Sequence, residues 1–159
     1  MQDKPKRIYL SGENGKGKCT IIDSEDLELL SKYSWNFGYH GYAVTTINKK
    51  FYNLHQLLFK IPKGKMIDHI NHNKLDNRKS NLRICTNAQN QWNQKKKLNK
   101  ISKYKGVTFA KARNKWQVSF IHYKKIIWGG RFDSEKKAAQ RYNELVGKFR
   151  GEFALLNKI

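Results

Sequence analysis

Residues 66–90, MIDHINHNKLDNRKSNLRICTNAQN, constrain the fold of this chain more than any other segment. The stretch NHNKLDNRKSNL reads as a loop between two short strands, because Asn, Asp and Ser hydrogen-bond their own backbone and favour turns. Thr86, followed three residues later by Gln89, is a capping-box pattern, which predicts that a helix begins at Thr86. The segment therefore predicts a strand, a loop, a second strand and a helix, in that order.

The same segment places a carboxylate, Asp68, directly before a histidine, His69. Phosphodiester hydrolysis needs a cation that neutralises the phosphate and the leaving oxygen, and a base that takes a proton from water. Asp68 could hold the cation and His69 could act as the base. Mg²⁺ takes oxygen ligands and keeps several waters, so one carboxylate and one amide oxygen would suffice. Asn90, on the first or second turn of the predicted helix, is the candidate for the second ligand.

The charge of the chain points to a polyanionic partner. Its 159 residues include 33 Lys and Arg against 12 Asp and Glu, a formal net charge of +21. Nucleic acid is the leading candidate because neutralising phosphates releases condensed counterions, and an anionic membrane is the rival. No apolar run approaches the roughly 20 residues that span a bilayer, and no signal-peptide core is present, so we expect a cytoplasmic protein with no membrane partner. Cys19 and Cys85 lack the Cys-x-x-Cys spacing of a thiolate zinc site.

The segments before the loop predict a small β-rich unit over residues 1–50. Short strands alternate there with Gly and Asn, and SEDLELLSKYSW reads as a short helix with Ser24 as its N-cap. The stretch NLHQLLFKIPKG predicts a second short helix that ends at Ile61, because the residue before Pro62 is pushed out of helical geometry. Residues 95–103 are polar and without apolar periodicity, which predicts a basic linker whose lysines either contact phosphates or are simply solvated.

The C-terminal part, residues 104–159, predicts a sheet covered by one helix. Residues 104–132 alternate apolar and polar side chains, with turn signals at ARNK and HYKK, which favours three antiparallel strands. The stretch DSEKKAAQRYNELVGKF is an amphipathic helix capped by Ser134 or Asp133. Its apolar residues at helical spacing are Ala138, Ala139, Tyr142, Leu145, Val146 and Phe149. The fold class expected for the whole chain is α+β.

The pattern DHINHNKLDNRKSNLRICTNAQN resembles the ββα-metal motif of HNH endonucleases, in the phage and intron-encoded branch that acts in bacterial cells. The resemblance covers residues 51–94, which we take as the nuclease unit. It implies that Asp68 is a metal ligand, that His69 is the general base and that Asn81 holds the loop as part of the catalytic motif. It also implies that Asn90 is the second metal ligand, in a position where the family often has His.

Three further polar residues near the motif have competing interpretations. His72 could be a second base or ligand, and we favour a surface or phosphate-contacting role. His55 opens a predicted helix, where a packing or orienting role is favoured. Asp76 is interpreted as closing the turn, with metal binding as the alternative.

Residues 104–157 resemble the plant ethylene-response-factor (Apetala) type of DNA-binding domain, through YKGV, KW, WGGRF, DSEKKAAQRYN and GEFALLN. That family lays its three-stranded sheet in the DNA major groove, with the helix behind the sheet. The resemblance implies that six apolar side chains face the helix: Val107, Phe109, Trp116, Val118, Phe120 and Phe132. Several exposed positions are Arg in the plant domains, and this chain has Thr108 and Ile121 there, so the plant target sequence is not transferred.

The candidate DNA-binding residues lie on the exposed side of this sheet, at its turns and in the linker. They are Lys105, Thr108, Lys111, Arg113, Lys115, Gln117, Ser119, Trp128, Arg131, Lys95, Lys96 and Lys97. Ile121 shares that exposed side.

These features lead to the hypothesis of a homing-type DNA endonuclease that uses one divalent cation, Mg²⁺ before Mn²⁺ or another, on double-stranded DNA. One site cuts one strand per encounter and no heptad seam is visible, which favours a monomer that nicks. A dimer or sequential action would cut both strands. The first alternative is a non-catalytic, sequence-specific DNA-binding regulator. An RNA-binding protein is a weaker alternative, because it would not explain the predicted major-groove sheet.

Overall fold

The computed structural model describes residues 4–95 and 101–159. Its contacts divide the chain into two compact units, Met1–Thr86 and Asn87–Ile159. Residues 1–50 and the strands of the nuclease motif thus share one unit, and the division falls before the helix that ends the motif. Each unit mixes helices with small antiparallel sheets, which confirms the α+β class. No helix among the described residues is both long and apolar enough to cross a membrane.

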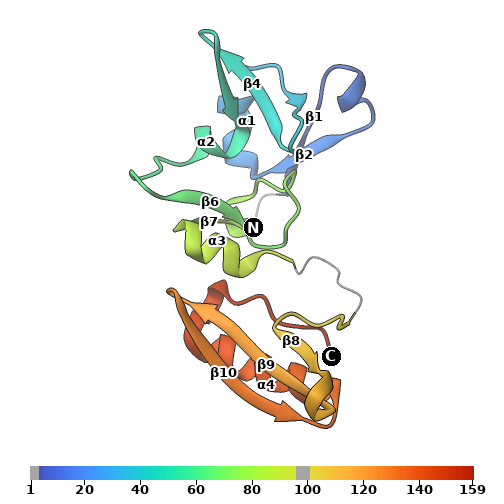
Figure 1. The fold of residues 1–159 in the computed structure, drawn as a ribbon. Helices are drawn as coiled ribbons and strands as arrows, with labels where there is room; N and C mark the ends of the chain where they lie inside the picture. Colours follow the sequence, from blue (N-terminus) through green and yellow to red (C-terminus); the bar gives the residue numbers. More distant parts are fainter. Residues whose placement is uncertain (1–3, 96–100) are drawn as a thin grey trace. The chain divides into compact units, whose positions relative to one another are not determined.

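The first unit consists of three small sheets and two short helices (Figure 1). A hairpin of β1 (Lys6–Tyr9) and β2 (Cys19–Ile22) comes first. The remaining elements are α1 (Leu27–Leu30), β3 (Asn36–Phe37), β4 (Ala43–Ile47), β5 (Lys50–Asn53), α2 (Leu54–Leu58), β6 (Met66–His69) and β7 (Leu82–Cys85). Strands β3, β4 and β5 form one sheet, and β6 pairs with β7 alone.

The short helices of this unit differ in detail from the sequence-based expectation. Ser24 lies inside a 3₁₀ turn, Ser24–Asp26, that precedes α1, so it is not the N-cap. Helix α2 begins at a capping box in which Asn53 and Gln56 bond each other's backbone. It ends at Leu58 because Phe59 already has extended backbone angles (φ −133°, ψ 135°). The restriction before Pro62 is therefore not what ends the helix.

The core of the first unit is small and apolar. Its buried side chains are Leu10, Ile22, Leu30, Trp35, Ala43 and Leu54. Trp35 is buried as a whole because its indole nitrogen donates to the Leu30 carbonyl oxygen at 2.8 Å, which satisfies its polar end. This core ties the β1–β2 hairpin to the central sheet and to α2.

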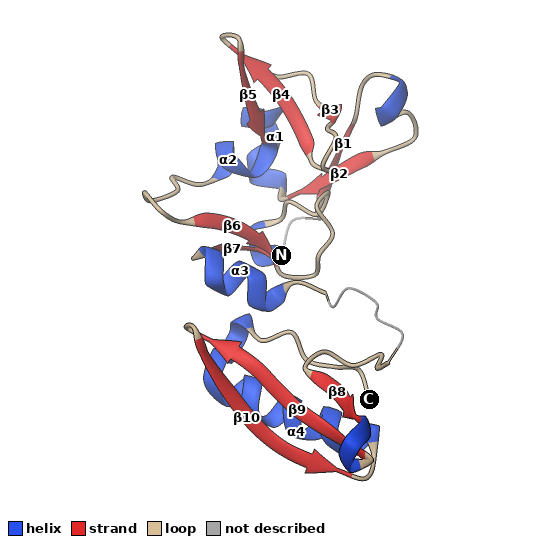
Figure 2. Cartoon of the chain, viewed as in Figure 1, coloured by secondary structure: helices blue, strands red, loops and turns tan. Residues whose placement is uncertain are grey.

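The second unit contains the expected three-stranded sheet and one long helix. The elements are α3 (Asn87–Asn93), β8 (Val107–Ala110), β9 (Lys115–His122), β10 (Lys125–Phe132) and α4 (Glu135–Arg150). The strands are antiparallel with β9 in the middle, and α4 crosses one face of the sheet (Figure 2). Ser134 caps α4, its hydroxyl accepting from the Lys137 backbone N–H.

Both turns of this sheet lie where the sequence predicts them. Asn114 has a left-handed backbone (φ 48°) after a 3₁₀ turn between β8 and β9. Tyr123 and Lys124 join β9 to β10 with φ values of 44° and 67°, as in the tight turns that suit twisted hairpins.

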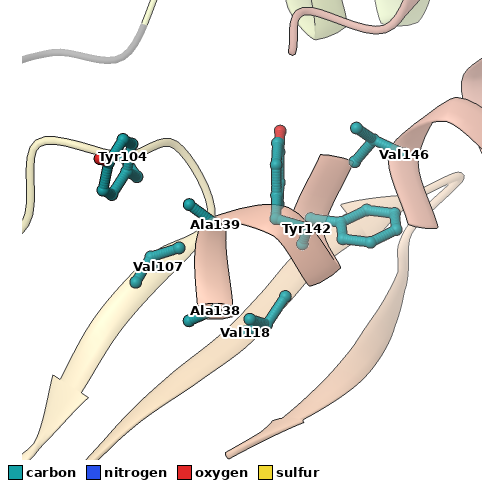
Figure 3. Close-up of a cluster of buried hydrophobic side chains, with 8 residues drawn as sticks. Tyr104, Val107, Val118, Ala138, Ala139, Tyr142 and Val146 are labelled. Carbon is teal, nitrogen blue, oxygen red and sulfur yellow. The ribbon is translucent and has the colours of Figure 1, made fainter. Parts of the chain in front are cut away.

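The core of the second unit lies between α4 and the sheet (Figure 3). It consists of Tyr104, Val107, Val118, Phe120, Ala138, Ala139, Tyr142 and Val146. Trp116, Phe132 and Leu145 are half-buried against it, whereas Phe149 is more exposed than expected, with 39% of its surface accessible. Gly106 allows the close approach of Tyr142, because a Cβ there would lie 2.1 Å from the tyrosine ring.

Candidate active site

Asp68 and His69 are the last two residues of β6, the strand that pairs with β7. In the antiparallel register, Asp68 is opposite Arg83 and His69 is opposite Leu82. Both side chains are buried, with 6% and 5% of their surface exposed. A buried carboxylate and a buried imidazole need hydrogen-bonding partners, and these come from Arg83 on β7 for Asp68 and from Asn77 in the loop between the two strands for His69.

The loop between β6 and β7 is fastened to strand β2 by backbone hydrogen bonds. The Ile21 N–H donates to the Leu75 carbonyl, and the Asn77 N–H donates to the Ile21 carbonyl, both at 2.8 Å. The Thr20 hydroxyl also donates to the Leu75 carbonyl at 2.9 Å. The N-terminal hairpin therefore completes the scaffold of the nuclease motif.

Asn81 braces this loop from inside. Its side-chain oxygen accepts from the Asn71 N–H at 3.0 Å, and its amide nitrogen donates to the Asp76 carbonyl at 2.7 Å. Its backbone carbonyl accepts from the Ile70 N–H at 2.9 Å. Asn81 thus bonds the backbone at the start and in the middle of the loop.

His69 is oriented by Asn77, a residue to which the sequence analysis gave no role. His69 Nε2 lies 3.2 Å from Asn77 Oδ1. Asn77 Nδ2 donates at 2.8 Å to the hydroxyl of Thr20, whose own proton goes to Leu75, so the amide oxygen faces the imidazole. An amide oxygen only accepts, so Nε2 carries the proton in the neutral ring and Nδ1 is the basic nitrogen.

Burial lowers the pKa of His69 below its usual value of 6.5, although Asn77 and the charges of Asp68 and Asp76 act in the opposite direction. The imidazole ring is further enclosed by Tyr42 and His55, whose ring centroids lie 5.7 and 5.2 Å away. Burial and the proximity of His69 lower the pKa of His55 to about 4. Both histidines are therefore neutral at pH 7, the state in which His69 can accept a proton.

Asp68 forms a buried ion pair with Arg83. The Arg83 Nε and Nη2 atoms both donate to Asp68 Oδ2, at 3.0 and 2.7 Å. The two side chains are only 7% and 10% exposed, so Arg83 offsets a carboxylate that would otherwise be costly to bury. The register of β6 and β7 places Arg83 directly opposite Asp68, and cross-strand partners of opposite charge attract each other.

The donor set fits a hard cation better than a transition metal. Within residues 4–95 and 101–159, no three His, Cys, Asp or Glu side chains form a group that could hold a metal ion. A carboxylate with an amide oxygen, and water for the rest, is the ligand chemistry of Mg²⁺. Asn90 lies on α3, which begins at Asn87, one residue after the start predicted from the capping pattern, and belongs to the second unit.

Asp76 and His72, two further polar residues of the loop, have structural partners. Asp76 accepts two hydrogen bonds from Arg78 and one from Asn71, all at 2.7 to 2.9 Å. The hydrogen bond from Arg78 is the main reason why the pKa of Asp76 lies below its ordinary value. His72 has a left-handed backbone (φ 66°), and its N–H donates to the His69 carbonyl. Asp76 thus closes the turn, as the sequence analysis favoured.

Some of the expected DNA-binding residues of the second unit lie on the outer face of the sheet, and the others lie outside that face. Thr108, Gln117 and Arg131 lie opposite one another across the three strands, on the face away from α4. On the same face, Ser119 is opposite Trp128, and the Arg131 guanidinium lies 4.9 Å from the Trp128 ring centre. Lys111, Arg113 and Lys95 are exposed.

Lys115 and Lys105 have partners of their own. Lys115 forms an ion pair with Asp133. Lys105 is turned inward: its ammonium donates to the Trp92 and Gln94 carbonyls at the end of α3, both at 2.6 Å. Burial, with the charge of Arg150, lowers the pKa of Lys105 to about 8. Lys105 therefore does not occupy the exposed position expected for it, and Lys96 and Lys97 lie outside the described residues.

Comparison with known proteins identifies the family. Residues 60–92 match the family model of an HNH endonuclease. A protein of Acanthamoeba polyphaga mimivirus described as an uncharacterized HNH endonuclease is 35% identical over 151 residues, which cover 91% of this chain and 78% of that protein. Protein 3.8 of Escherichia phage T7 is 40% identical over 57 residues, 36% of this chain and 47% of that protein. No solved structure matched. The chain therefore belongs to the HNH endonuclease family and is a nuclease.

Proposed function

We propose that this nuclease is a site-directed DNA endonuclease of the homing type, in which His69 is the general base. Enzymes of this family act on DNA and generally use a divalent metal ion. The observation that carries the proposal is the burial of His69 as a neutral imidazole whose Nε2 is held by Asn77. A base must be unprotonated at the working pH and held in a fixed orientation, and the lowered pKa of His69 and its hydrogen bond to Asn77 support this role.

The proposed reaction is hydrolysis of one phosphodiester bond. His69 Nδ1 takes a proton from a water molecule as the water oxygen attacks phosphorus, and the 3′ oxygen leaves in line with the attack. The products are a 5′ phosphate and a 3′ hydroxyl. Asp68 and Asn90 would hold the divalent cation, most simply Mg²⁺, which supplies charge stabilisation for the phosphate and the leaving oxygen.

Four residues prepare the site without touching the substrate. Asn77 fixes the orientation and tautomer of His69, and Arg83 pairs with the buried carboxylate of Asp68. Asn81 keeps the loop in the shape that presents Asn77 to His69. In this proposal the N-terminal hairpin serves catalysis indirectly, because the Thr20 hydroxyl fixes the Asn77 amide.

The second unit is proposed to bind the double-stranded DNA through the sheet face opposite α4, in the manner of the ethylene-response-factor type. Residues 87–132 contain no Asp or Glu, and the acids of the unit are Asp133, Glu135, Glu144 and Glu152, all at the start of α4 or beyond. The strands thus present cations without competing carboxylates, which suits a polyanionic partner. Lys105 is not part of the proposed interface, because its ammonium donates a hydrogen bond to the Trp92 carbonyl of α3.

The remaining parts of the proposal concern organisation. Residues 95–103 would act as a tether that sets the distance between the cut and the bound sequence. A monomer would cut one DNA strand each time it binds, and two binding events would be needed to cut both strands. The proposed place of action is the cytoplasm of a bacterial cell, infected or host.

Conversion of supercoiled plasmid DNA to nicked and linear forms, in Mg²⁺ or in EDTA, tests the proposal. We expect cleavage only with the cation, and a loss of roughly 10²- to 10⁴-fold in His69→Ala, the range for a general base. His72→Ala is the matched control, since His72 lies in the same loop, and it should retain cleavage. Gel-shift binding should persist in both variants. DNA binding without cleavage by the wild type would instead support the regulator.

A further inference from the structure

The face of the sheet opposite α4 carries an apolar strip at one end. Ile121 on β9 lies directly opposite Ile126 on β10, and Trp128 follows two residues further along β10. Their side chains are 61%, 75% and 51% exposed. Exposed β-branched side chains paired across two strands leave apolar surface in water, so this apolar strip calls for a binding partner.

A polar row crosses the same face about four residues away along β9. It consists of Thr108, Gln117 and Arg131, which are aligned across β8, β9 and β10. Four residues of strand correspond to about 13 Å, or roughly the length of four base pairs. The face therefore has two chemically different reading surfaces, one polar and one apolar.

Charge decides which partner the apolar strip fits. Lys124 lies in the β9–β10 turn next to the strip, and no Asp or Glu occurs anywhere in residues 87–132. A protein partner would gain little from so uniform a field of cations unless it were acidic, whereas DNA places phosphates on both sides of its grooves. If the partner is DNA, the apolar strip has to contact an apolar group of the DNA. On the edges of base pairs in the major groove, that group is the C5-methyl of thymine.

We infer that Ile121 and Ile126 contact thymine methyl groups, and that the DNA site of this protein contains A·T pairs at the end covered by the apolar strip. Gln117 is suited to bind an adenine, since a side-chain amide pairs with its N6 and N7 atoms. Arg131 lies against Trp128 and adds a donor for guanine or phosphate. This inference rests on the proposed binding of DNA by the sheet and names the bases that the sheet selects.

Replacing thymine by deoxyuridine removes only the methyl group and keeps every hydrogen bond, so it isolates the inferred contact. A duplex is first selected from a random pool by the full-length wild type in EDTA, which prevents cleavage. It is then resynthesised with deoxyuridine at each thymine in turn. We expect affinity to fall about fourfold for each methyl group that the apolar strip contacts, the value for one buried carbon group.

The variant Ile121→Ala/Ile126→Ala should bind the thymine and deoxyuridine duplexes equally. Both side chains are exposed, so the substitutions leave the core intact. Lys111→Ala is the matched control: an exposed cation at the other end of the sheet should weaken binding of both duplexes alike and preserve their difference.

Each other outcome has a distinct meaning. Equal binding of both duplexes by the wild type would overturn the inference and leave the proposed DNA binding intact. Failure of the wild type to bind any duplex would overturn the proposed function of the sheet itself. A change in sedimentation from dimer to monomer in the double variant would show that the apolar strip joins two copies of the chain, and would also overturn the inference.

Discussion

The two compact units use polar side chains in opposite ways. Among the described residues, the first unit buries nine of them, Thr20, Asp26, Thr45, His55, Asp68, His69, Asp76, Asn77 and Asn81, and the second buries Asn93, Ser102 and Arg150. The candidate catalytic arrangement of the first unit is a hydrogen-bonded network inside the fold. The candidate reading surface of the second is the outer face of a sheet whose stability comes from an apolar core on the other side.

The difference has a physical consequence for mutation. A buried polar network is stabilising only while every member is satisfied, so losing one member leaves another unpaired. An outer sheet face has water as an alternative partner, so its side chains can change with little effect on folding. The first unit should therefore couple stability to catalysis, and the second should separate stability from recognition.

Arg83→Met should give the largest loss of stability. It leaves the buried carboxylate of Asp68 without its ion-pair partner, and removal of one member of a buried pair costs roughly 3–5 kcal/mol. Urea unfolding, followed by hydrogen exchange to separate the two units, measures the loss. Adding Asp68→Asn to Arg83→Met should restore most of it, because no buried charge then remains. A single variant as stable as the wild type would show that the pair does not support the first unit.

Acid should destabilise the first unit through His55. Its pKa is about 4 in the folded protein and 6.5 when unfolded, so the unfolded chain binds the proton more readily. The stabilisation is present above pH 6.5 and is lost as pH falls towards 4, by about 3 kcal/mol from a difference of roughly 2.5 pKa units.

Unfolding by urea at pH 7 and at pH 4, in the wild type and in His55→Gln, tests this linkage. The variant has no proton to bind at this position and should lose much less stability between the two pH values. Equal acid sensitivity in both proteins would remove His55 as the cause.

The sequence predicted those elements that short-range patterns control. The three strands of residues 104–132 and the helix capped by Ser134 were predicted because alternation, turn residues and a hydroxyl cap act within a few positions. The contact between β2 and the loop was not predicted, since it is made by backbone groups of Ile21, Leu75 and Asn77, far apart in the chain. No side-chain pattern encodes such a pairing.

The same limit applies to the candidate site. Asp68, His69 and Asn81 are candidates because the motif that contains them resembles a known one, whereas the part played by Thr20 depends on an amide 57 positions away. Lys105 shows the converse: its place in a strand-like pattern suggested an exposed side chain, but the carbonyls at the end of α3 draw its ammonium inward.

Asn77→Ala should reduce cleavage more than it reduces stability. Loss of the hydrogen bond to His69 Nε2 leaves the imidazole free to rotate, and misplacement of a reacting group can cost up to about 10²-fold in rate. The same hydrogen bond raises the pKa of His69, so its loss should move the acid limb of the pH–rate profile to lower pH. Asn73→Ala is the control, because Asn73 lies in the same loop and accepts from the Leu75 N–H. An unchanged acid limb in Asn77→Ala would contradict the positioning role.

Gln117→Ala should have the smallest effect on stability. Gln56→Ala, a Gln-to-Ala substitution in the first unit, allows a direct comparison of the two units. Gln117 projects from the outer face of the sheet, so its loss should change the free energy of unfolding by no more than about 0.5 kcal/mol. Gln56 accepts from the Asn53 N–H at 2.7 Å in the capping box of α2, so Gln56→Ala should cost about 1 kcal/mol. DNA affinity should respond in the reverse order, falling for Gln117→Ala and remaining unchanged for Gln56→Ala. If Gln117→Ala destabilised the protein as much as Gln56→Ala does, the outer face would be part of the folding scaffold, and recognition could not vary independently of stability.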